Sequence, residues 1–380
     1  MNPPAKAAVL IIGGQAQSLV NFRGPLLKSL VGLGYRVIGA APSLSADSKA
    51  SSDLAGFGVS CRDIPLSRTG LNPIADLRSL ISLVRLMRTE KPDVVIAYTA
   101  KPVIFGIMAA FLARVPSRYA LITGLGYAFT GEATGKKRVI RSAMNLLYRL
   151  AFKAADKVFF QNPDDADTFR SLGLIPARLP VAIVNGSGVD LNRFQPAPFP
   201  GPPIRFLLIA RLLSAKGIRE YCSAAAIVRK RHPKAEFHLV GGLDSNPDAL
   251  APEEIERWTD ERLVEWHGEV ADIRPFIQAS HVYVLPSYRE GTPRSVLEAM
   301  AMGRPIITTD APGCRETVVH GENGFLVPVR AAEPLAKAME RFIEHPQLIE
   351  PMGKRSLEIA ERKYDAEKVN AHMLGEMGLG

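Results

Sequence analysis

Short apolar runs alternate with segments of helical spacing along the first half of the chain. The run Ala7–Ile12 ends in Gly13-Gly14, and Ser18–Gly34 follows with apolar residues at helical intervals. Short apolar runs bounded by turn residues are typical of buried parallel strands. The alternation predicts further strands and helices as far as residue 161: strands at Tyr35–Ala40, Asp93–Tyr98, Arg118–Ile122 and Lys157–Gln161, and helices at Pro73–Thr89, Pro102–Ala113 and Lys136–Ala155. Repeated strand–helix units predict an α/β fold with a doubly wound parallel sheet.

The same pattern restarts after a proline-rich segment. Residues 192–203, NRFQPAPFPGPP, contain five prolines and are predicted to be a linker rather than regular structure. Strands are then predicted at Ile204–Ile209, Ala235–Val240, Val264–His267, Val282–Leu285 and Pro305–Thr308. We therefore expect two Rossmann-like domains, 1–191 and 204–362, facing a cleft, with ligands at the carboxyl ends of the strands.

Charge is unevenly divided between the two halves. The chain of 380 residues has a formal net charge of +9, and residues 1–200 hold 24 Lys and Arg against 12 Asp and Glu. The first half is therefore expected to meet an anionic partner, which leaves nucleic acid, a lipid surface and a phosphorylated substrate open. The three cysteines are far apart and form no C-x-x-C motif, so neither a disulfide framework nor a zinc site is expected.

The lengths of the apolar runs indicate whether the chain is expected to cross a membrane. Val103–Ala113 is the longest apolar stretch, well below the roughly 20 residues that cross a bilayer. Ala7–Ile12 is too short for the apolar core of a signal peptide. The expected location is the cytoplasm, with attachment to a membrane surface left open.

Two carboxylates stand eight residues apart in the run SYREGTPRSVLEAMAMGRPII. Glu290 precedes the small-residue loop Gly291-Thr292-Pro293, and Glu298 follows within a predicted helix, Ser295–Met302. A helix start of this kind attracts phosphate through its backbone N–H groups. Two carboxylates beside a phosphate site suit a ligand with hydroxyls at both ends, which describes a nucleotide sugar.

The spacing of these carboxylates resembles the E-x7-E signature of retaining glycosyltransferases with two Rossmann domains, the family-four GT-B type. The resemblance covers nearly the whole chain. Arg211 and Lys216 match the R-x4-K pattern of that family, which implies that they neutralise the leaving nucleoside diphosphate without a metal ion or cofactor. It also implies that residues 363–380 form a helix that packs back on the first domain.

The resemblance implies roles on the donor side. Glu290 would hold the sugar hydroxyls and Glu298 the ribose hydroxyls, while the other expected donor contacts are Gly14, Gly241, Gly268, Gly291 and Thr292. The Asp165-Ala166-Asp167 run has the form of a metal-binding D-x-D motif. It lies at a predicted helix start, where acidic residues suit the helix dipole, so no metal role is expected.

The acceptor side has fewer signals. Thr99 and Lys101 flank Ala100, where many relatives carry a histidine, and Lys101 is a candidate contact for an acceptor phosphate. The loop Thr123–Phe129 resembles the acceptor loop of bacterial transferases of capsule, O-antigen and protein-glycan assembly, PglA-like enzymes especially. Tyr127 in this loop could stack on a sugar or pack within the turn.

The helix predicted at 137–153 has two distinct faces. Its basic half, together with two aromatic residues, is similar to a membrane-surface face, with a solvated face as the alternative. The apolar half is expected to face the sheet. The candidate membrane-surface residues are Arg138, Arg141, Arg149, Lys153, Tyr148 and Phe152.

These features predict a retaining glycosyltransferase. It would move an N-acetylhexosamine or hexose from a UDP-sugar onto a polyprenyl-diphosphate-linked saccharide at the inner face of the cell membrane, with no nucleic acid as partner. A nucleotide-sugar 2-epimerase of the same fold is the enzymatic alternative, and a two-lobed solute-binding protein is the non-enzymatic one. An assay for sugar transfer, free epimer or binding without turnover separates the three.

Overall fold

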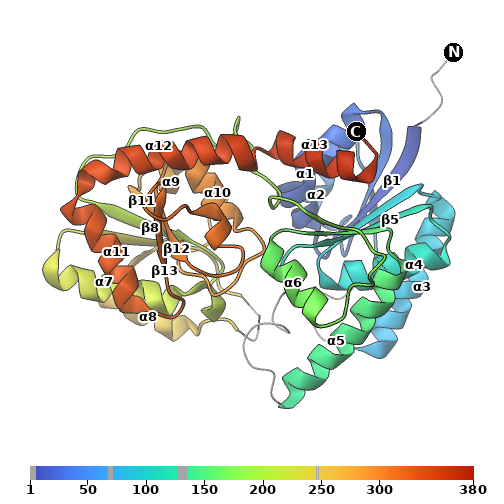
Figure 1. The fold of residues 1–380 in the computed structure, drawn as a ribbon, viewed down its shortest axis with the longest axis horizontal. Helices are drawn as coiled ribbons and strands as arrows, with labels where there is room; N and C mark the ends of the chain where they lie inside the picture. The colour runs from blue at the N-terminus through green and yellow to red at the C-terminus, as the bar shows by residue number, and fades with distance from the viewer. Residues whose placement is uncertain (1–5, 67–71, 126–134, 245, 247) are drawn as a thin grey trace. The chain divides into compact units, whose positions relative to one another are not determined.

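The chain folds into two compact units. The computed structural model describes residues 6–66, 72–125, 135–244, 246 and 248–380, without the side chains of residues 6, 136 and 137. The first unit comprises Met1–Ser187 and Ala366–Gly380, and the second comprises Gly188–Asp365. Residues 192–203 belong to the second unit by this division, and the last helix belongs to the first (Figure 1).

A parallel sheet of seven strands forms the centre of the first unit. Its order is β3-β2-β1-β4-β5-β6-β7. Ile12 pairs with Ala40 on one side and Ala97 on the other, so β1, β2 and β4 end together at one edge. The strands are β1 Lys6–Ile12, β2 Tyr35–Ala41, β3 Ser60–Asp63, β4 Val94–Tyr98, β5 Ser117–Ile122, β6 Lys157–Phe160 and β7 Val181–Ile183.

Helices cover both faces of this sheet. On one face pack α1 (Ala16–Gly32), α2 (Ser48–Gly56) and α13 (Ala366–Met377). On the other pack α3 (Pro73–Glu90), α4 (Ile107–Leu112) with the preceding π-helical turn Pro102–Gly106, α5 (Gly135–Ala154) and α6 (Pro163–Ser171). Within the described residues, no helix is long and apolar enough to reach across a bilayer.

The last helix is fastened to the first unit by apolar and polar contacts. Met373, Leu374 and Met377 join the apolar cluster beneath α1 and α2. The Tyr119 hydroxyl donates to the carbonyl of Met377 at 2.9 Å, which anchors the end of α13 to β5. The chain thus passes from the first unit to the second and ends in the first.

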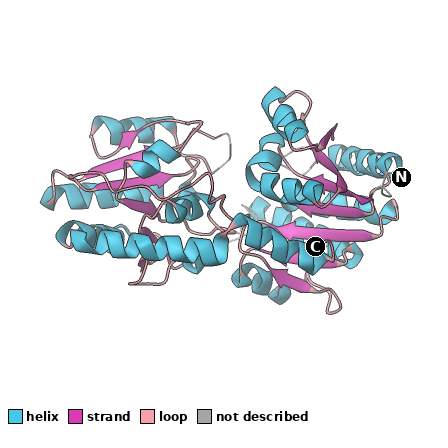
Figure 2. Cartoon of the chain, turned by 90° about the horizontal axis from the view of Figure 1, so that it is seen from above, coloured by secondary structure: helices cyan, strands magenta, loops and turns pink. Residues whose placement is uncertain are grey.

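The second unit repeats the plan with six parallel strands in the order β10-β9-β8-β11-β12-β13. The strands are β8 Arg205–Ile209, β9 Glu236–Val240, β10 Glu265–Trp266, β11 Val282–Leu285, β12 Ile306–Thr309 and β13 Gly324–Val327. The helices are α7 Ile218–Arg231, α8 Pro252–Asp260, α9 Arg274–Gln278, α10 Arg294–Ala301, α11 Ala332–Glu344 and α12 Ile349–Ile359. Figure 2 shows helices on both sides of the strands in each unit.

The expected fold class is confirmed: both units are α/β, and every strand pair in both sheets is parallel. The sequence pattern missed β3, β7 and β13. The side chains of β3 and β7 are mostly exposed or half-buried, so these two strands have no continuous apolar run. β13 is only four residues long and begins at Gly324, a poor strand signal.

Candidate active site

The candidate site lies where two strands of the second unit end. β8 ends at Ile209, and the loop after it carries Arg211 and a short 3-10 helix, Ser214–Lys216. β11 ends at Leu285, and the loop after it carries Glu290 before α10 begins at Arg294. Because β8 and β11 are neighbouring parallel strands, both loops leave the same edge of the sheet.

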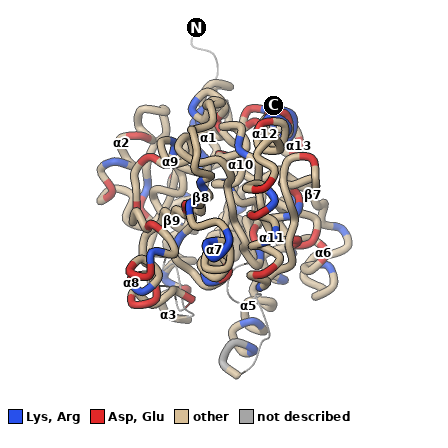
Figure 3. The backbone as a smooth tube through the Cα atoms, turned by 90° about the vertical axis from the view of Figure 1, so that its left-hand side faces the viewer, with Lys and Arg blue, Asp and Glu red and all other residues tan. Residues whose placement is uncertain are grey.

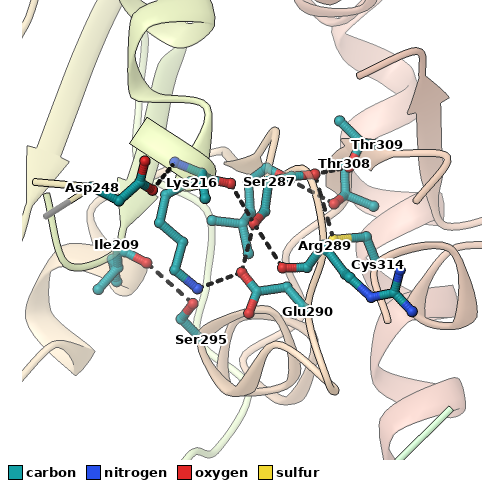
Figure 4. Close-up of polar contacts among 12 residues, drawn as sticks. Ile209, Lys216, Asp248, Ser287, Arg289, Glu290, Ser295, Thr308, Thr309 and Cys314 are labelled. Atoms are coloured by element: carbon teal, nitrogen blue, oxygen red, sulfur yellow. Dashed lines mark hydrogen bonds and ion pairs between the residues drawn. The ribbon is translucent and has the colours of Figure 1, made fainter. Parts of the chain in front are cut away.

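An ion pair joins the two loops. The Lys216 ammonium lies 2.5 Å from Oε1 of Glu290, and both side chains are largely withdrawn from solvent. The Ser287 hydroxyl donates to the same carboxylate oxygen at 2.7 Å (Figure 4). The backbone also connects the loops, since Tyr288 donates its N–H to the carbonyl of Ala215 at 2.9 Å. Two of the residues expected to meet the donor are therefore brought into direct contact.

The start of α10 is braced against the end of β8. The buried Tyr283 hydroxyl lies 3.0 Å from the carbonyl of Ile209 and 2.7 Å from the Ser295 hydroxyl. Burial raises the pKa of Tyr283 well above its usual range, so the phenol stays protonated and available as a donor. This brace fixes the helix start relative to the strand edge.

At two positions on this edge of the sheet, the backbone conformation and close contacts allow only glycine. Gly217, after Lys216, has φ of 72°, and a Cβ there would lie 2.0 Å from the carbonyl oxygen of Pro286. Gly241, after β9, has φ of 153°, and a Cβ would lie 1.8 Å from the carbonyl oxygen of Ala210. Only glycine lets the backbone approach so closely. The N–H of Gly241 donates to the carbonyl of Gly268 at 2.8 Å, which brings together two expected donor-side glycines.

Arg211 is held near the site by a carboxylate that the sequence did not point to. One of its guanidinium nitrogens lies 2.8 Å from Asp244, and about half of the Arg211 side chain is exposed. A guanidinium carries several N–H donors, so pairing with one carboxylate oxygen leaves it able to bind an anion.

Glu298 is buried on α10, with 6% of its surface exposed. Its carboxylate forms an ion pair at 2.8 Å with Arg294, one turn earlier on the same helix. Burial raises the pKa of Glu298, and the charge of Arg294 opposes that rise. Gly291 and Thr292 stand in the loop before α10, as expected. The proposed ribose contact of Glu298 and the donor contacts of this loop stay predictions.

In the first unit, two of the expected residues meet at one strand edge. A Cβ on Gly14, in the loop after β1, would lie 3.2 Å from the Thr99 hydroxyl. Thr99 follows β4 and has φ of 69°, an unusual conformation for a β-branched residue. Tyr127 lies outside the described residues.

Lys101 has a different environment from the one expected. Its ammonium is buried and lies 2.7 Å from Asp76 of α3. The charge is therefore already neutralised inside the unit, and this placement does not support a contact with an acceptor phosphate.

The expected orientation of α5 is wrong. Tyr148 and Phe152 are each only 1% exposed, and their rings pack against Phe169 of α6 with centroids 5.0 and 5.8 Å away. They therefore cannot be membrane-surface residues. Arg138, Arg149 and Lys153 are exposed and Arg141 is half-buried. Four residues of the half expected to face the sheet are exposed instead: Val139, Ile140, Leu146 and Leu150.

Metal-ligand chemistry is limited to one group within the described part of the chain. His238, Glu265 and His267 place possible ligand atoms within 4.8 Å of one another at the β9–β10 edge. The two imidazoles lie 3.0 Å apart, Nδ1 to Nε2, as a hydrogen-bonded pair. Asp165, in the first turn of α6, is buried, and its N–H donates to the capping Asn162 side chain at 2.8 Å. Asp167 pairs with Arg170 at 2.8 Å on that helix.

Several residues of the site escaped the sequence analysis. Ser287, Tyr283 and Asp244 each hold an expected residue or its helix in place. A tyrosine within a buried strand and a serine just after it give no signal by themselves. Only the separation of three residues between Ser287 and Glu290, within one tight loop, could have suggested their contact.

Comparisons with known proteins agree with this architecture. Residues 23–186 match the family model of the glycosyl transferase 4-like domain, and residues 203–345 match that of glycosyl transferases group 1.

Two relatives extend over most of the chain. One is the N,N'-diacetylbacillosaminyl-diphospho-undecaprenol alpha-1,3-N-acetylgalactosaminyltransferase of Campylobacter jejuni, 30% identical over 87% of this chain and 88% of the relative. Another is the UDP-Gal:alpha-D-GlcNAc-diphosphoundecaprenol alpha-1,3-galactosyltransferase of Escherichia coli, 29% identical over 75% of this chain and 73% of the relative.

The fold is also that of solved structures. Sucrose-phosphate synthase from Thermosynechococcus elongatus superposes with a TM-score of 0.79 over 97% of each chain, at 19% identity. Matches through both units, and a relative 30% identical along most of its length, show that this chain belongs to the glycosyltransferases, with the GT-B fold of the group 1 and 4-like type.

Proposed function

We propose that this glycosyltransferase moves an N-acetylhexosamine or hexose from a UDP-sugar onto a saccharide linked to a polyprenyl diphosphate, with retention at the anomeric carbon. The observation that carries the proposal is the Lys216–Glu290 pair at the joined ends of β8 and β11. It sets a cation and a carboxylate side by side, as a ligand with a diphosphate next to a sugar requires. The names of the Campylobacter and Escherichia relatives support the donor and acceptor classes.

The diphosphate would meet Lys216 and Arg211. An ammonium has three N–H donors, and Glu290 takes one of those of Lys216, so this group can hold the carboxylate and a phosphate oxygen together. Arg211, steadied by Asp244, adds a second charge from the same loop. Stabilising the charge that develops on the leaving UDP is the largest contribution that such a site can make.

Glu290 would position the sugar. Its carboxylate is oriented by Ser287 and Lys216, and in that position it would accept hydrogen bonds from sugar hydroxyls. Glu298 would accept from the ribose hydroxyls, four residues inside α10. A ligand held at both ends in this way presents its anomeric carbon in one orientation only.

The transfer itself needs no protein base. As the bond from the anomeric carbon to the UDP oxygen breaks, the acceptor hydroxyl oxygen bonds to the same face of that carbon. The hydroxyl proton passes to the departing phosphate oxygen. Ala100 carries no group that could act as a base, which is compatible with this route.

The acceptor would be reached at the inner face of the cell membrane, where its polyprenyl chain is embedded. To test the proposal, the protein is incubated with UDP-hexoses and UDP-N-acetylhexosamines, each with a short-chain polyprenyl-diphosphate saccharide. Product mass is then read. The expected result is an acceptor heavier by one sugar and an equal amount of UDP. Release of a free epimer, or binding without turnover, would replace the proposal with one of its rivals.

A further inference from the structure

Exposed apolar side chains are concentrated on three neighbouring helices of the first unit. Of the fifteen large apolar side chains exposed among the described residues, nine lie on α3, α4 and α5: Ile74, Leu77, Ile81, Phe111, Leu112, Val139, Ile140, Leu146 and Leu150. The central helix, α4, contacts both α3 and α5 (Figure 1). Exposed apolar residues scattered singly are ordinary, but a gathering of this kind marks a binding surface.

On α3 the exposed apolar residues form a stripe. Ile74, Leu77 and Ile81 recur at intervals of three and four, and between 44% and 68% of each is exposed. The sheet-facing side of the same helix is formed by other residues, including Leu83 and Met87, which are buried. The outer stripe is therefore additional to the residues that hold α3 in the fold.

A second stripe follows α5. Val139, Leu146 and Leu150 share one side of this helix, and between 46% and 70% of each is exposed. The inner side is occupied by Tyr148 and Phe152, whose burial anchors the helix. α5 is thus apolar on two sides, and only one of these sides is explained by packing within the unit.

The stripes are bordered by cations. Arg78, Arg85 and Arg88 are exposed on α3, and Arg138, Arg149 and Lys153 are exposed on α5. The sequence of α5 contains no Asp or Glu, and positive residues recur along it (Figure 3). On α3, Asp76 is buried against Lys101, and Glu90 is paired with Arg36 and Arg62. The outer face therefore combines apolar stripes with exposed arginine and lysine side chains, of which Arg149 also donates to the carbonyls of Leu172 and Gly173.

We propose that the outer face of α3, α4 and α5, defined by these apolar and basic residues, lies on an anionic bilayer. Its apolar side chains enter the boundary between headgroups and acyl chains, and its arginines and lysines bind lipid phosphates. This inference deepens the proposed function, on which it rests, because a polyprenyl-linked acceptor is presented in such a bilayer. It differs from docking through charge alone, since apolar residues enter the membrane.

A bilayer fits this face better than a second copy of the chain. In a twofold dimer the same patch would meet itself, which sets the arginines of α3 and α5 against those of the partner. Like charges facing each other across an interface are strongly unfavourable. An anionic lipid surface satisfies the apolar stripes and the charges together.

A tryptophan probe tests insertion directly. Both native tryptophans, Trp258 and Trp266, lie in the second unit. We expect Leu146→Trp to show blue-shifted emission on phosphatidylglycerol vesicles and quenching by lipids brominated near the headgroup end of the acyl chain. Val319→Trp, at an exposed apolar site of the second unit, is the matched control and should show neither change. Absence of quenching at Leu146→Trp would overturn the proposal.

Removal of the stripes gives the converse test. The variant Leu77→Ser/Ile81→Ser/Leu146→Ser/Leu150→Ser should bind these vesicles at least about tenfold more weakly, because apolar burial is lost. Val319→Ser/Val329→Ser should bind as the native protein does. In 1 M salt the native protein should bind more weakly but still measurably, since charge is screened and apolar burial is not. Unchanged binding of the fourfold variant would contradict the proposal.

Two further measurements distinguish failure of the membrane proposal from failure of the proposed function. Light scattering without lipid should give a monomer mass for the native protein; a dimer that the fourfold serine variant abolishes would mean that the face binds a second copy. Transfer to a short-chain, water-soluble acceptor should be the same in the fourfold variant and the native protein. Quenching without any sugar transfer would refute the proposed function but support the membrane-binding face. Sugar transfer without quenching would support the proposed function but refute the membrane-binding face.

Discussion

At the scale of single residues, the contact between Lys216 and Glu290 has the greatest consequence. Glu290 is oriented by Ser287 of its own loop and by Lys216 of the other, and the two loops are joined through Tyr288 and Ala215. The ammonium would therefore meet the proposed diphosphate from a fixed position rather than from a mobile surface side chain. Such preorganisation makes a charge effective in a transition state.

Removing either cation should weaken use of the donor. Arg211→Ala and Lys216→Ala each lose a charge-assisted contact of about 1.5–3 kcal/mol, hence roughly 10–100-fold in kcat/KM for the UDP-sugar. The double variant should lose less than the product of the two effects because both cations serve one diphosphate. Steady-state kinetics measures this. Arg231→Ala, an exposed arginine at the far end of α7, is the control and should leave the kinetics unchanged. Native kinetics in both single variants would refute the diphosphate site.

We expect substitutions of Glu290 and Glu298 to have different effects, because the two carboxylates are assigned different roles. Glu290→Gln should lower turnover more than UDP affinity, because this group is placed at the sugar. Glu298→Gln should mainly weaken UDP binding. Titration calorimetry with UDP, beside turnover measurements, decides the matter, and the opposite pattern would reverse the assignment.

Residue-level surprises came from partners distant in sequence. Lys101 stood out as an isolated cation in a loop, yet its charge is neutralised by Asp76, twenty-five residues earlier. Likewise, the ion-pair partner of Arg211 is Asp244, thirty-three residues later. Motif spacing could indicate Arg211, Lys216, Glu290 and Glu298, but side-chain pairing across elements depends on a topology that no local pattern contains.

At the scale of elements, burial explains what could be predicted. Strands covered by helices on both faces, such as β1, β4 and β11, have continuous apolar runs and were evident. α5 was predicted as a helix but assigned the wrong inner side. Helical periodicity showed two faces without stating which one meets the sheet, and α5 has apolar residues on both. Its aromatic residues fill the inner side because they reach Phe169 of α6.

The strand-end glycines offer an element-level test. Gly241→Ala should destabilise the second unit by about 1–3 kcal/mol, since its φ is unfavourable and a Cβ would meet the carbonyl of Ala210. UDP affinity should fall with it. Gly201→Ala is the control, because nothing lies within 4 Å of a Cβ there. Thermal unfolding of both variants measures the difference; equal midpoints would show that the β9 turn tolerates a side chain.

At the scale of the whole molecule, positive charge is concentrated in the first half of the chain, and the residues proposed to bind the donor lie in the second half. Residues 1–200 carry the basic excess, whereas Lys216, Glu290 and Glu298 belong to the second unit. An anionic donor and a membrane-held acceptor would thus each have a unit suited to them. This division of labour fits the two family models, which match one unit each.

Sugar transfer should survive chelation. In the proposed function Arg211 and Lys216 supply positive charge to the leaving group, while Asp165 lies in the first turn of α6 and Asp167 pairs with Arg170 on the same helix. Activity in excess EDTA should therefore equal activity in Mg²⁺ or Mn²⁺. Asp167→Ala, which avoids disturbing the buried Asp165, should also leave activity unchanged. The account would be contradicted if activity strictly required either ion and if Asp167→Ala abolished that activity.

The most direct test of the central claim is the mass of the acceptor after incubation with UDP-sugars, compared between the native protein and Lys216→Ala. The account predicts that the native protein adds one sugar, with stoichiometric UDP. It also predicts that Lys216→Ala forms that product roughly 10–100-fold more slowly while keeping the native fold. An acceptor of unchanged mass with every donor, or equal rates in the two proteins, would contradict it.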